Sequence, residues 1–496
     1  MLEHMKAEAN KGYTENGAVT YTTTGKECLN LFSTIGAMRN ATDEEITQKF
    51  VMAFIEDSDL AMKILFFARD IREGLGERRV FRVIVKWLAN NRKETVIKNI
   101  KYIAEYGRFD DLLVLLGTNC EKEALGYIQK QFIDDCIAME NGQPISLLAK
   151  WLPSVNASNK ETVKMAKKVA KSFNMNDATY RKQLSKLRRY LNIIENNLRE
   201  KDYTFDYEKQ PSRALFKYRM AFVRNDLERY DDFMIRVQNG EAKLKTGNVA
   251  PYELVEPYLS AEYYYKTRSF VKQMTDKERE ILNTTWSSLP NYCGDDNVIA
   301  VVDTSGSMYD YNAPKPASVA ISLGIYLAEH NKGKFANHII TFSKKPKLIE
   351  LTGDNLVDKL YQVSSNMEVA NTDIEAVFRL ILDVALKYHV NQEELPKTIV
   401  IISDMEFDAC AENSTVTNFE NAKNMYEQYG YRLPEIVFWN VACRNANQPV
   451  RANDRGVALV SGATPRLFGM IAKGKLSPYE FMLEVVESER YKDIIA

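Results

Sequence analysis

The sequence contains little cysteine and histidine and no long apolar run. Its six cysteines form no CxxC pair, which suits reduced thiols in a cytoplasmic protein better than a disulfide framework. The four histidines form no HExxH pattern, so a zinc enzyme is not expected. No apolar stretch approaches the roughly 20 residues that span a bilayer, and the opening MLEHMKAEANKGYTENG resembles no secretory signal. We therefore expect a cytoplasmic protein without a membrane partner.

Charge of either sign is balanced over the chain but not along it. The 66 Lys and Arg residues nearly cancel the 67 Asp and Glu residues. Residues 150–224, in contrast, carry 18 basic and 7 acidic residues. A local excess of one sign inside a neutral protein indicates a surface for a polyanionic partner.

Helical periodicity dominates from about residue 27 to residue 280. Apolar residues recur at helical spacing in the segments 60–71, 80–91, 95–107, 111–119 and 124–139. Short helices in succession, without convincing strands, predict an all-helical array similar to HEAT repeats over residues 1–290. The segment REGLGERR (72–79) lacks the GxxxxGK[ST] order of a phosphate loop, so its two glycines are expected only to end a helix.

From about residue 297 the pattern changes to strands that alternate with helices. Strands are expected at 297–303, 337–342, 397–404, 434–442 and 456–462, with helices at 317–331, 373–389 and 421–430. Apolar strands separated by amphipathic helices are typical of a mostly parallel sheet that is covered on both faces. We predict a doubly wound α/β domain over residues 291–496, with the boundary in the turn-rich stretch SSLPNYCGDD (287–296).

Oxygen-bearing side chains follow two of the expected strands. Asp303 ends the first strand, Ser305 and Ser307 follow it at alternate positions, and Asp404 ends the strand TIVIISD. Thr372 stands just before a helix. Because ligand sites form at the carboxyl ends of parallel strands, these side chains are expected to converge. Carboxylates with neutral hydroxyls suit Mg²⁺ or another hard divalent cation that keeps some of its waters.

Other interpretations of this cluster stay open. The DTSGS segment could simply enter a helix, with a serine as its cap. Asp373 or Ser403 could take the place of Thr372 or Asp404. A metal-dependent hydrolase would need a general base, for which Glu406 and Asp408 are the local candidates. We expect both to lie in a solvated loop, so hydrolysis is the weakest hypothesis and no enzymatic activity is expected.

The order DTSGS, a distant threonine and a distant aspartate resembles the metal-ion-dependent adhesion site of von Willebrand factor A domains. The resemblance covers roughly residues 297–496. It implies that Asp303, Ser305 and Ser307 form the first ligating loop, Thr372 the second and Asp404 the third. It also implies an open coordination position that accepts a partner's carboxylate.

Two basic helices are expected between residues 159 and 199. The first helix carries an apolar stripe of Val163, Ala166, Ala170 and Phe173. The second carries a stripe of leucines and one isoleucine that runs from Leu184 to Leu198. Cations and aromatic residues fill their remaining faces and could neutralise phosphates and stack on unpaired bases. The predicted RNA contacts are Lys150, Lys160, Lys164, Lys167, Lys168, Lys171, Tyr180, Arg181, Lys182, Lys186, Arg188 and Arg189. A merely solvated face is the alternative.

Several motifs occur in a characteristic order along the chain. They are TENGAVTYTTTGKECLNLFSTIG (14–36), ILFFARDIREGLGERRVFR (64–82), YGRFDDLLVLL (106–116), LLAKWLPS (147–154), YRKQLSKLRRYL and PSRALFKYR. Together with the A-type domain they resemble the TROVE family of Ro autoantigen-like ribonucleoproteins, and its bacterial, phage and plant branch most closely. The resemblance implies a ring of helical repeats that is closed by the A domain. It also implies that this ring binds structured non-coding RNA and single-stranded 3′ ends.

The leading hypothesis is therefore an RNA-binding protein, and we expect it to be a monomer. Its alternative is a Mg²⁺-dependent scaffold that captures an acidic protein partner through the metal. Chelation by EDTA should abolish the second mode and spare the first.

Overall fold

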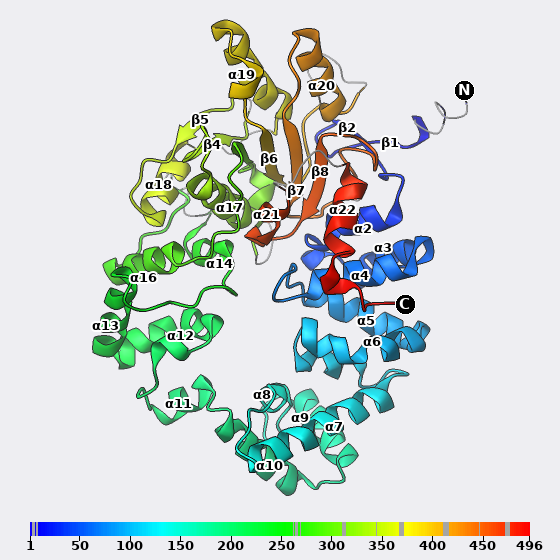
Figure 1. The fold of residues 1–496 in the computed structure, drawn as a ribbon, viewed down its shortest axis with the longest axis vertical. Coiled ribbons are helices and arrows are strands. Elements are labelled where there is room, and N and C mark those ends of the chain that lie inside the picture. Colours follow the sequence, from blue (N-terminus) through cyan, green and yellow to red (C-terminus); the bar gives the residue numbers. More distant parts are fainter. Residues whose placement is uncertain are drawn as a thin grey trace. The chain divides into compact units, whose positions relative to one another are not determined.

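A computed structural model describes most of the chain. The described residues are 1, 5, 8–260, 262, 266–267, 269–309, 314–343, 345–366, 372–409, 416–445, 447–471 and 477–496. They form two compact units (Figure 1). Unit 1 comprises Met1–Ile64, Glu73–Leu75 and Thr246–Tyr491; unit 2 comprises Leu65–Arg72, Gly76–Lys245 and Lys492–Ala496.

These units differ from the predicted division into 1–290 and 291–496. The first 64 residues belong with the sheet because they bond to it directly. Thr14 Oγ1 donates to the carbonyl oxygen of Phe407 at 2.6 Å, and the backbone of Tyr21 exchanges hydrogen bonds with that of Gln448. Local periodicity carries no information about pairings between residues that lie about 400 positions apart. The predicted boundary was therefore placed where the helical pattern gives way to alternating strands and helices.

A six-stranded sheet forms the centre of unit 1. Its order is β5 (Leu348–Glu350), β4 (His338–Thr341), β3 (Val298–Val302), β6 (Thr398–Ser403), β7 (Glu435–Asn440) and β8 (Val457–Ser461). All neighbours are parallel except β4 and β5. We predicted a mostly parallel sheet with intervening helices, and the structure confirms a sheet of parallel strands with one antiparallel edge strand. Its central strands are apolar on both faces because helices cover both.

The helices of unit 1 fall into two sets. Those between or after the strands are α17 (Pro316–His330), α18 (Leu356–Asn366), α19 (Ile374–Tyr388), α20 (Asn418–Gln428), α21 (Phe468–Ile471) and α22 (Pro478–Val486). Those before the sheet are α2 (Glu27–Ile35), α3 (Asp43–Glu56), α14 (Pro251–Val255) and α16 (Asp276–Ser287). The short strands β1 (Lys11–Tyr13) and β2 (Val19–Tyr21) form an antiparallel hairpin.

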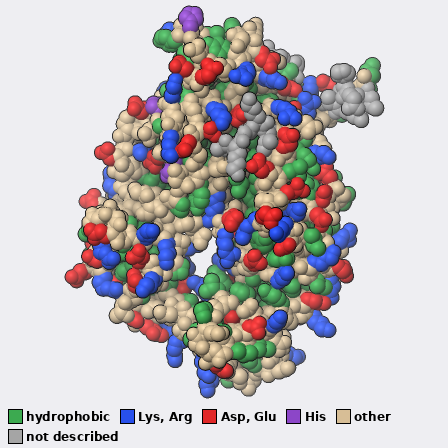
Figure 2. Space-filling model, viewed as in Figure 1, with side chains coloured by type: hydrophobic (Ala, Val, Ile, Leu, Met, Phe, Trp, Pro, Cys, Tyr) green, Lys and Arg blue, Asp and Glu red, His purple; other side chains and the backbone are tan. Residues whose placement is uncertain are grey.

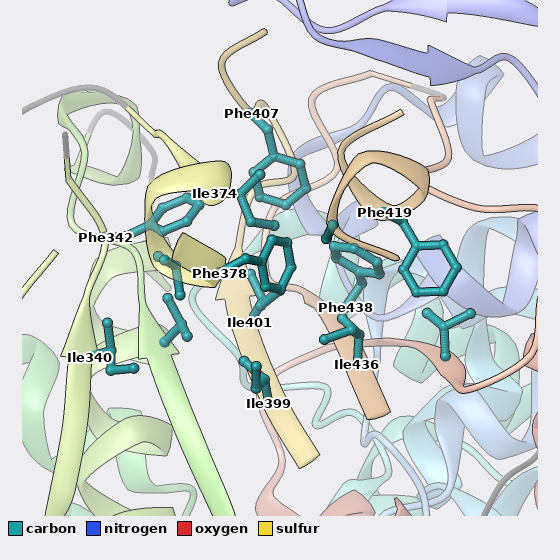
Figure 3. Packing of buried hydrophobic residues seen from close by; sticks show 14 of the residues in the cluster. Ile340, Phe342, Ile374, Phe378, Ile399, Ile401, Phe407, Phe419, Ile436 and Phe438 are labelled. Carbon is teal, nitrogen blue, oxygen red and sulfur yellow. The ribbon is translucent and has the colours of Figure 1, made fainter. Parts of the chain in front are cut away.

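One hydrophobic core lies between the sheet and the pair α19 and α20. In Figure 3 the side chains of Phe378, Phe407 and Phe438 gather above the strands. The ring of Phe407 lies 5.8 Å, centroid to centroid, from both Phe342 and Phe438. Phe407 follows β6, so this packing fixes the loop that also carries Asp404.

Unit 2 is helical, as predicted, and α4 (Ser58–Arg69) leads into it. Its helices are α5 (Arg79–Asn91), α6 (Lys93–Tyr106), α7 (Glu121–Glu140), α8 (Leu148–Trp151), α9 (Lys160–Ser172), α10 (Asp177–Tyr190), α11 (Ile194–Glu200), α12 (Ser212–Asn225) and α13 (Leu227–Gln238). Two details differ from expectation. The segment 111–119 contributes to a 3-10 helix, η2 (Phe109–Leu115), and the second basic helix ends at Tyr190 because Asn192 adopts a positive φ of 46°.

Candidate functional site

Two aspartates lie at the same edge of the sheet, just beyond β3 and β6. The strands are parallel neighbours in the register Val302 with Ile402, so the residues that follow them emerge together. Asp303 is 0% exposed and Asp404 is 1% exposed. The expected convergence of these two carboxylates is therefore present, and both are out of contact with bulk water.

A chain of hydrogen bonds joins the two carboxylates through the serines. Asp303 Oδ1 accepts from the backbone N–H of Ser305 at 2.9 Å. The hydroxyls of Ser305 and Ser307 share a hydrogen bond of 3.1 Å, and Ser307 Oγ donates to Asp404 Oδ2 at 2.8 Å. Asp303 Oδ2 also accepts from Ser403 Oγ at 2.6 Å. Four of the five predicted ligands thus meet in one network.

Thr372, the fifth, reaches the network through one further residue. Its hydroxyl donates to the carbonyl oxygen of Glu406 at 2.7 Å, and the N–H of Glu406 donates to Asp404 Oδ1 at 3.2 Å. Its neighbour Asp373 is occupied elsewhere, because its side chain caps α19 by accepting from the N–H of Ala376. Of the two, Thr372 is the one that faces the cluster.

Two buried carboxylates and one guanidinium group set the electrostatics of the cluster. Burial, and then the charge of Asp404, raise the pKa of Asp303 above its usual range. A guanidinium atom, Arg444 Nη1, lies 3.6 Å from Asp404 Oδ2. Thr304 Oγ1, between Asp303 and Ser305 in sequence, is buried without a hydrogen-bond partner. An all-oxygen set with two buried carboxylates fits Mg²⁺ with retained waters.

The same set does not fit a softer or more demanding metal. Within the described part of the chain, no three or more His, Cys, Asp and Glu side chains come together as a metal-binding group. The donors at this edge are two carboxylates and neutral hydroxyls, so a zinc site with nitrogen and sulfur ligands has no basis here.

The tip of the β1–β2 hairpin, residues Thr14–Gly17, lies against this cluster. Asn16 Nδ2 donates to Thr372 Oγ1 at 3.0 Å and to the carbonyl oxygen of Glu406 at 2.7 Å. Glu15 Oε2 lies 2.7 Å from Arg444 Nη2, so Arg444 stands between Glu15 and Asp404. The position of this hairpin tip was not predicted from the sequence. TENG signals a turn, but no signal in it points to partners in residues 372–445.

Glu406 is buried, not solvated as predicted. It is 4% exposed, and burial raises the pKa of its carboxyl group. Its oxygens accept from the N–H of Glu15 at 2.7 Å and from Asn445 Nδ2 at 2.9 Å. The hairpin tip covers the loop, which explains why a polar loop residue is removed from water.

Two of the predicted RNA contacts are structural. Tyr180 is 0% exposed and its hydroxyl donates to the carbonyl oxygen of Pro153 at 2.9 Å. Arg188 is half-buried and donates to the carbonyl oxygens of Ala149 and Leu152 at 2.8 and 2.7 Å. The spacing of Tyr180 four residues before Leu184 places it on the apolar face of α10, so the sequence did contain the signal for its burial.

Acidic partners neutralise several of the predicted lysines. Lys164 pairs with Glu161 at 2.7 Å, Lys167 with Asp177 at 3.5 Å and Lys168 with Glu121 at 2.8 Å. Lys150 lies 3.2 Å from Glu195. Glu161, Asp177 and Glu195 are among the 7 acidic residues of segment 150–224, and only Glu121 comes from outside it; the pairs show which of the predicted lysines are neutralised. Consistent with this, Lys and Arg are interspersed with Asp and Glu over much of the face in Figure 2.

The remaining predicted cations form an exposed group on α9 and α10. In unit 2, whose residues 76–245 are all described, these side chains are exposed and take part in no salt bridge. They are Lys160, Lys171, Arg181, Lys182, Lys186 and Arg189. We call them the α9–α10 basic group. They are the part of the predicted interface that is free to meet an anion.

Comparisons with known proteins match both parts of the chain. Residues 14–135 and 128–292 match the family described as a domain of unknown function, DUF2828, and residues 297–492 match another domain of unknown function, DUF7788. A relative from Acanthamoeba polyphaga mimivirus, "Uncharacterized protein L728", is 29% identical over 523 residues, which cover 97% of this chain and 88% of that protein.

A comparison with solved structures finds the crystal structure of the Deinococcus radiodurans Ro (RSR) protein. The TM-score is 0.43 at 11% sequence identity, over 94% of this chain and 100% of that one. Among the described residues, no helix is both long enough and apolar enough to cross a membrane. The segments that match the first family model span more than half of the sequence, and the chain therefore belongs to the DUF2828 family.

Proposed function

We propose that this protein binds RNA through the helical unit 2. The observation that carries the proposal is the α9–α10 basic group, six exposed cations without salt-bridge partners on two successive helices. Such a group releases counterions when it meets phosphates, and this gives salt-dependent affinity without base-specific contacts. The resemblance to Ro-like ribonucleoproteins in the order of motifs supports structured or 3′-single-stranded non-coding RNA as the ligand, within a ring of helices closed by the A-type domain.

The test is RNA binding by the purified chain, with a hairpin that has or lacks a single-stranded 3′ tail. Binding is measured at two salt concentrations, with Mg²⁺ and with EDTA. A variant in which Lys182, Lys186 and Arg189 become Glu should lose at least tenfold in affinity and should show a shallower salt dependence. The matched control converts Lys122, Lys130 and Lys243, exposed lysines elsewhere in unit 2, to Glu and should retain most of the affinity.

If the wild-type chain binds neither hairpin at low salt, the RNA proposal is contradicted. Equal loss in the test and control variants would show a general charge effect and would remove the α9–α10 basic group as its site. Preference for the tailed hairpin would support recognition of 3′ ends.

We also propose that Asp303, Ser305, Ser307, Thr372 and Asp404 hold Mg²⁺ or another hard divalent cation, some of them through water. A bound cation would neutralise the two buried carboxylates and offer a coordination position to an acidic group. The support is the burial of both carboxylates and the network that aligns four of these side chains.

Thermal unfolding with added MgCl₂ or EDTA tests this site. Cation binding should stabilise the wild-type chain by about 2.7 kcal/mol when the free cation is at 100 times its Kd. Asp404→Asn should abolish the response, whereas Asp383→Asn, at an exposed position of α19, should keep it. If none of Mg²⁺, Mn²⁺ and Ca²⁺ changes the melting temperature of the wild-type chain, the proposal is contradicted.

The alternative of an acidic protein partner at the metal has weaker support. The hairpin tip already places Glu15 and Asn16 of the same chain on the loops that a partner would approach. The proposal includes no hydrolytic activity; the carboxylate of Glu406 accepts hydrogen bonds from the N–H of Glu15 and from Asn445 under the hairpin tip.

A further inference from the structure

Two consecutive aspartates of unit 2 gather more arginines than they can neutralise. Asp110 and Asp111 lie in the first turn of η2, and four guanidinium groups contact them. These belong to Arg69 at the end of α4, Arg78 and Arg82 at the start of α5, and Arg108 just before η2. Four positive groups therefore meet two negative ones.

The inner part of this cluster is a closed structural ion pair. Asp111 is 0% exposed and its Oδ2 receives Arg69 Nε at 2.8 Å and Arg69 Nη2 at 2.7 Å. Its Oδ1 receives Arg82 Nε at 2.6 Å. Both oxygens of Asp111 are thereby occupied, and Arg69 is itself only 2% exposed. This pair joins α4, α5 and η2 and is out of reach of a ligand.

The outer part is different because three guanidinium groups share one carboxylate. Arg78 Nη2 and Arg82 Nη2 each lie 2.7 Å from Asp110 Oδ2, and Arg108 Nε lies 3.2 Å from Oδ1. The side chain of Arg78 is 50% exposed and that of Arg108 is 24% exposed. Positive charge in excess of the carboxylate therefore faces the solvent.

Three side-chain atoms around Asp110 have poor hydrogen-bond geometry. Arg82 Nη2, Arg108 Nε and Asp110 Oδ1 are buried and, despite the short ion contacts, make no well-directed hydrogen bond. Burial lowers the pKa of Arg108; the charge of Asp110 opposes this shift and the charge of Arg78 adds to it. These buried donors already face the Asp110 carboxylate, so an added anion would meet the exposed donors of Arg78 and Arg108 instead.

The arginines are also held in position before any ligand arrives. The guanidinium carbon of Arg108 lies 4.1 Å from the ring centroid of Trp151, a stacking distance. Arg78 is the N-cap residue of α5, a helix of 13 residues whose first turn holds no acidic residue and no side-chain cap. The N-terminal end of that helix adds positive potential at Arg78.

We propose that Arg78, Arg82 and Arg108 form an oxyanion site for a phosphate group, with Asp110 keeping the three guanidinium groups together. A guanidinium fork matches the oxygens of phosphate, and the exposed Arg78 and Arg108 offer free donors for it. The segment REGLGERR thus contributes to phosphate binding through side chains, although it lacks a phosphate loop. The identification of the phosphate as that of an RNA backbone rests on the proposed function, whereas the oxyanion site does not.

The experiment compares Arg78→Gln and Arg78→Lys with Arg92→Gln in the full chain. Arg92 is an exposed arginine next to the other end of α5, where its Nη1 donates to the carbonyl oxygen of Asn91. One probe is inorganic phosphate, read as a shift in melting temperature at constant ionic strength. The other is a 12-nucleotide oligouridylate, whose affinity is followed over a range of salt concentrations.

The site predicts that phosphate raises the melting temperature of the wild-type chain and of Arg92→Gln. Arg78→Gln should bind phosphate at least fivefold more weakly, and its salt slope for the oligonucleotide should fall by roughly 0.7, the value of one single-strand phosphate contact. Arg78→Lys keeps the charge without the fork and should lie between the two. Because Arg78 is half exposed, its replacement leaves the Asp111 pair intact.

The outcomes separate this inference from the proposed function. If the wild-type chain responds to phosphate through Arg78 but binds no RNA at low salt, the oxyanion site stands for a small phosphate ligand and the RNA proposal fails. If RNA binds and Arg78→Gln matches the wild type with both probes, the RNA proposal stands and the site is overturned. A wild-type chain that responds to neither probe overturns both.

Discussion

Neighbouring arginines on α10 have opposite environments. Arg188 donates to the carbonyl oxygens of Ala149 and Leu152, which end the short helix α8, and burial lowers the pKa of its guanidinium group. Arg189 is exposed and belongs to the α9–α10 basic group. Successive side chains of an α-helix are rotated by about 100° around its axis. Arg188 therefore points to a buried contact, whereas Arg189 points to the surface.

We expect Arg188→Gln to destabilise the contact between α8 and α10 by roughly 2–3 kcal/mol, because two charge-assisted hydrogen bonds are lost. Arg189→Gln should change stability by less than about 0.5 kcal/mol. Hydrogen exchange of the α8 amides measures the difference. Equal protection in the two variants would contradict the structural role of Arg188.

Individual site residues differed in how far the sequence could predict them. Asp303 and Asp404 were predictable because the ends of parallel strands must meet at one edge of the sheet. Arg444 and Asn16 were not, since each acts through contacts with residues that no local pattern connects to them. The periodicity that marks Leu184 and Leu187 as buried also covers Tyr180, whereas the prediction of base stacking rests on its aromatic ring alone.

At the scale of elements, α2 approaches the end of β8 very closely. The N–H of Gly36, which ends α2, donates to Ser461 Oγ at 3.0 Å. A Cβ atom at Gly36 would lie 2.6 Å from the carbonyl oxygen of Ser461, which is backbone and cannot move aside easily. Glycine is required here by the contact and not by its backbone angle.

Gly36→Ala is expected to destabilise unit 1 by roughly 1–3 kcal/mol through overpacking. Gly126→Ala is the matched control, because its Cβ in the middle of α7 would meet nothing within 4 Å. That change should stabilise unit 2 by roughly 0.5–1 kcal/mol. Urea unfolding followed by hydrogen exchange assigns each effect to its unit. A neutral Gly36→Ala would show that α2 can shift away from β8.

Most elements were predictable from the sequence alone, and the exceptions have physical causes. The segments 80–91 and 373–389 correspond closely to α5 and α19, since both carry a full apolar stripe. The basic helix predicted to continue to Leu198 ends at Tyr190 instead. Leucine spacing continues across that break, so periodicity could not reveal the turn at Asn192.

At the scale of the whole molecule, each compact unit is built from separated pieces of sequence. Residues 8–24, the β1–β2 hairpin with its flanks, complete unit 1 from the far end of the chain. Ala18 is part of the core cluster of the sheet, and Tyr21 donates to Glu420 Oε1 at 2.9 Å. Removing this hairpin therefore takes partners from the loops after β6 and β7.

A chain that lacks residues 1–24 should exchange the amides of residues 404–408 at least tenfold faster than the full chain, because the hairpin tip no longer bonds to them. Exchange in α9 and α10 of unit 2 should stay unchanged and serves as the internal control. Unaltered exchange at 404–408 would mean that the loop holds its conformation without the hairpin.

The hairpin tip also sets an order in time. Glu15 leaves the ribosome 391 residues before Glu406, the partner of its N–H group. At 5–20 residues per second this interval is roughly 20–80 s. Throughout this interval the β1–β2 hairpin lacks its partners in residues 406–448, while the helices of unit 2 can already form. The hairpin tip can therefore close over the oxygen cluster only after synthesis has passed residue 445.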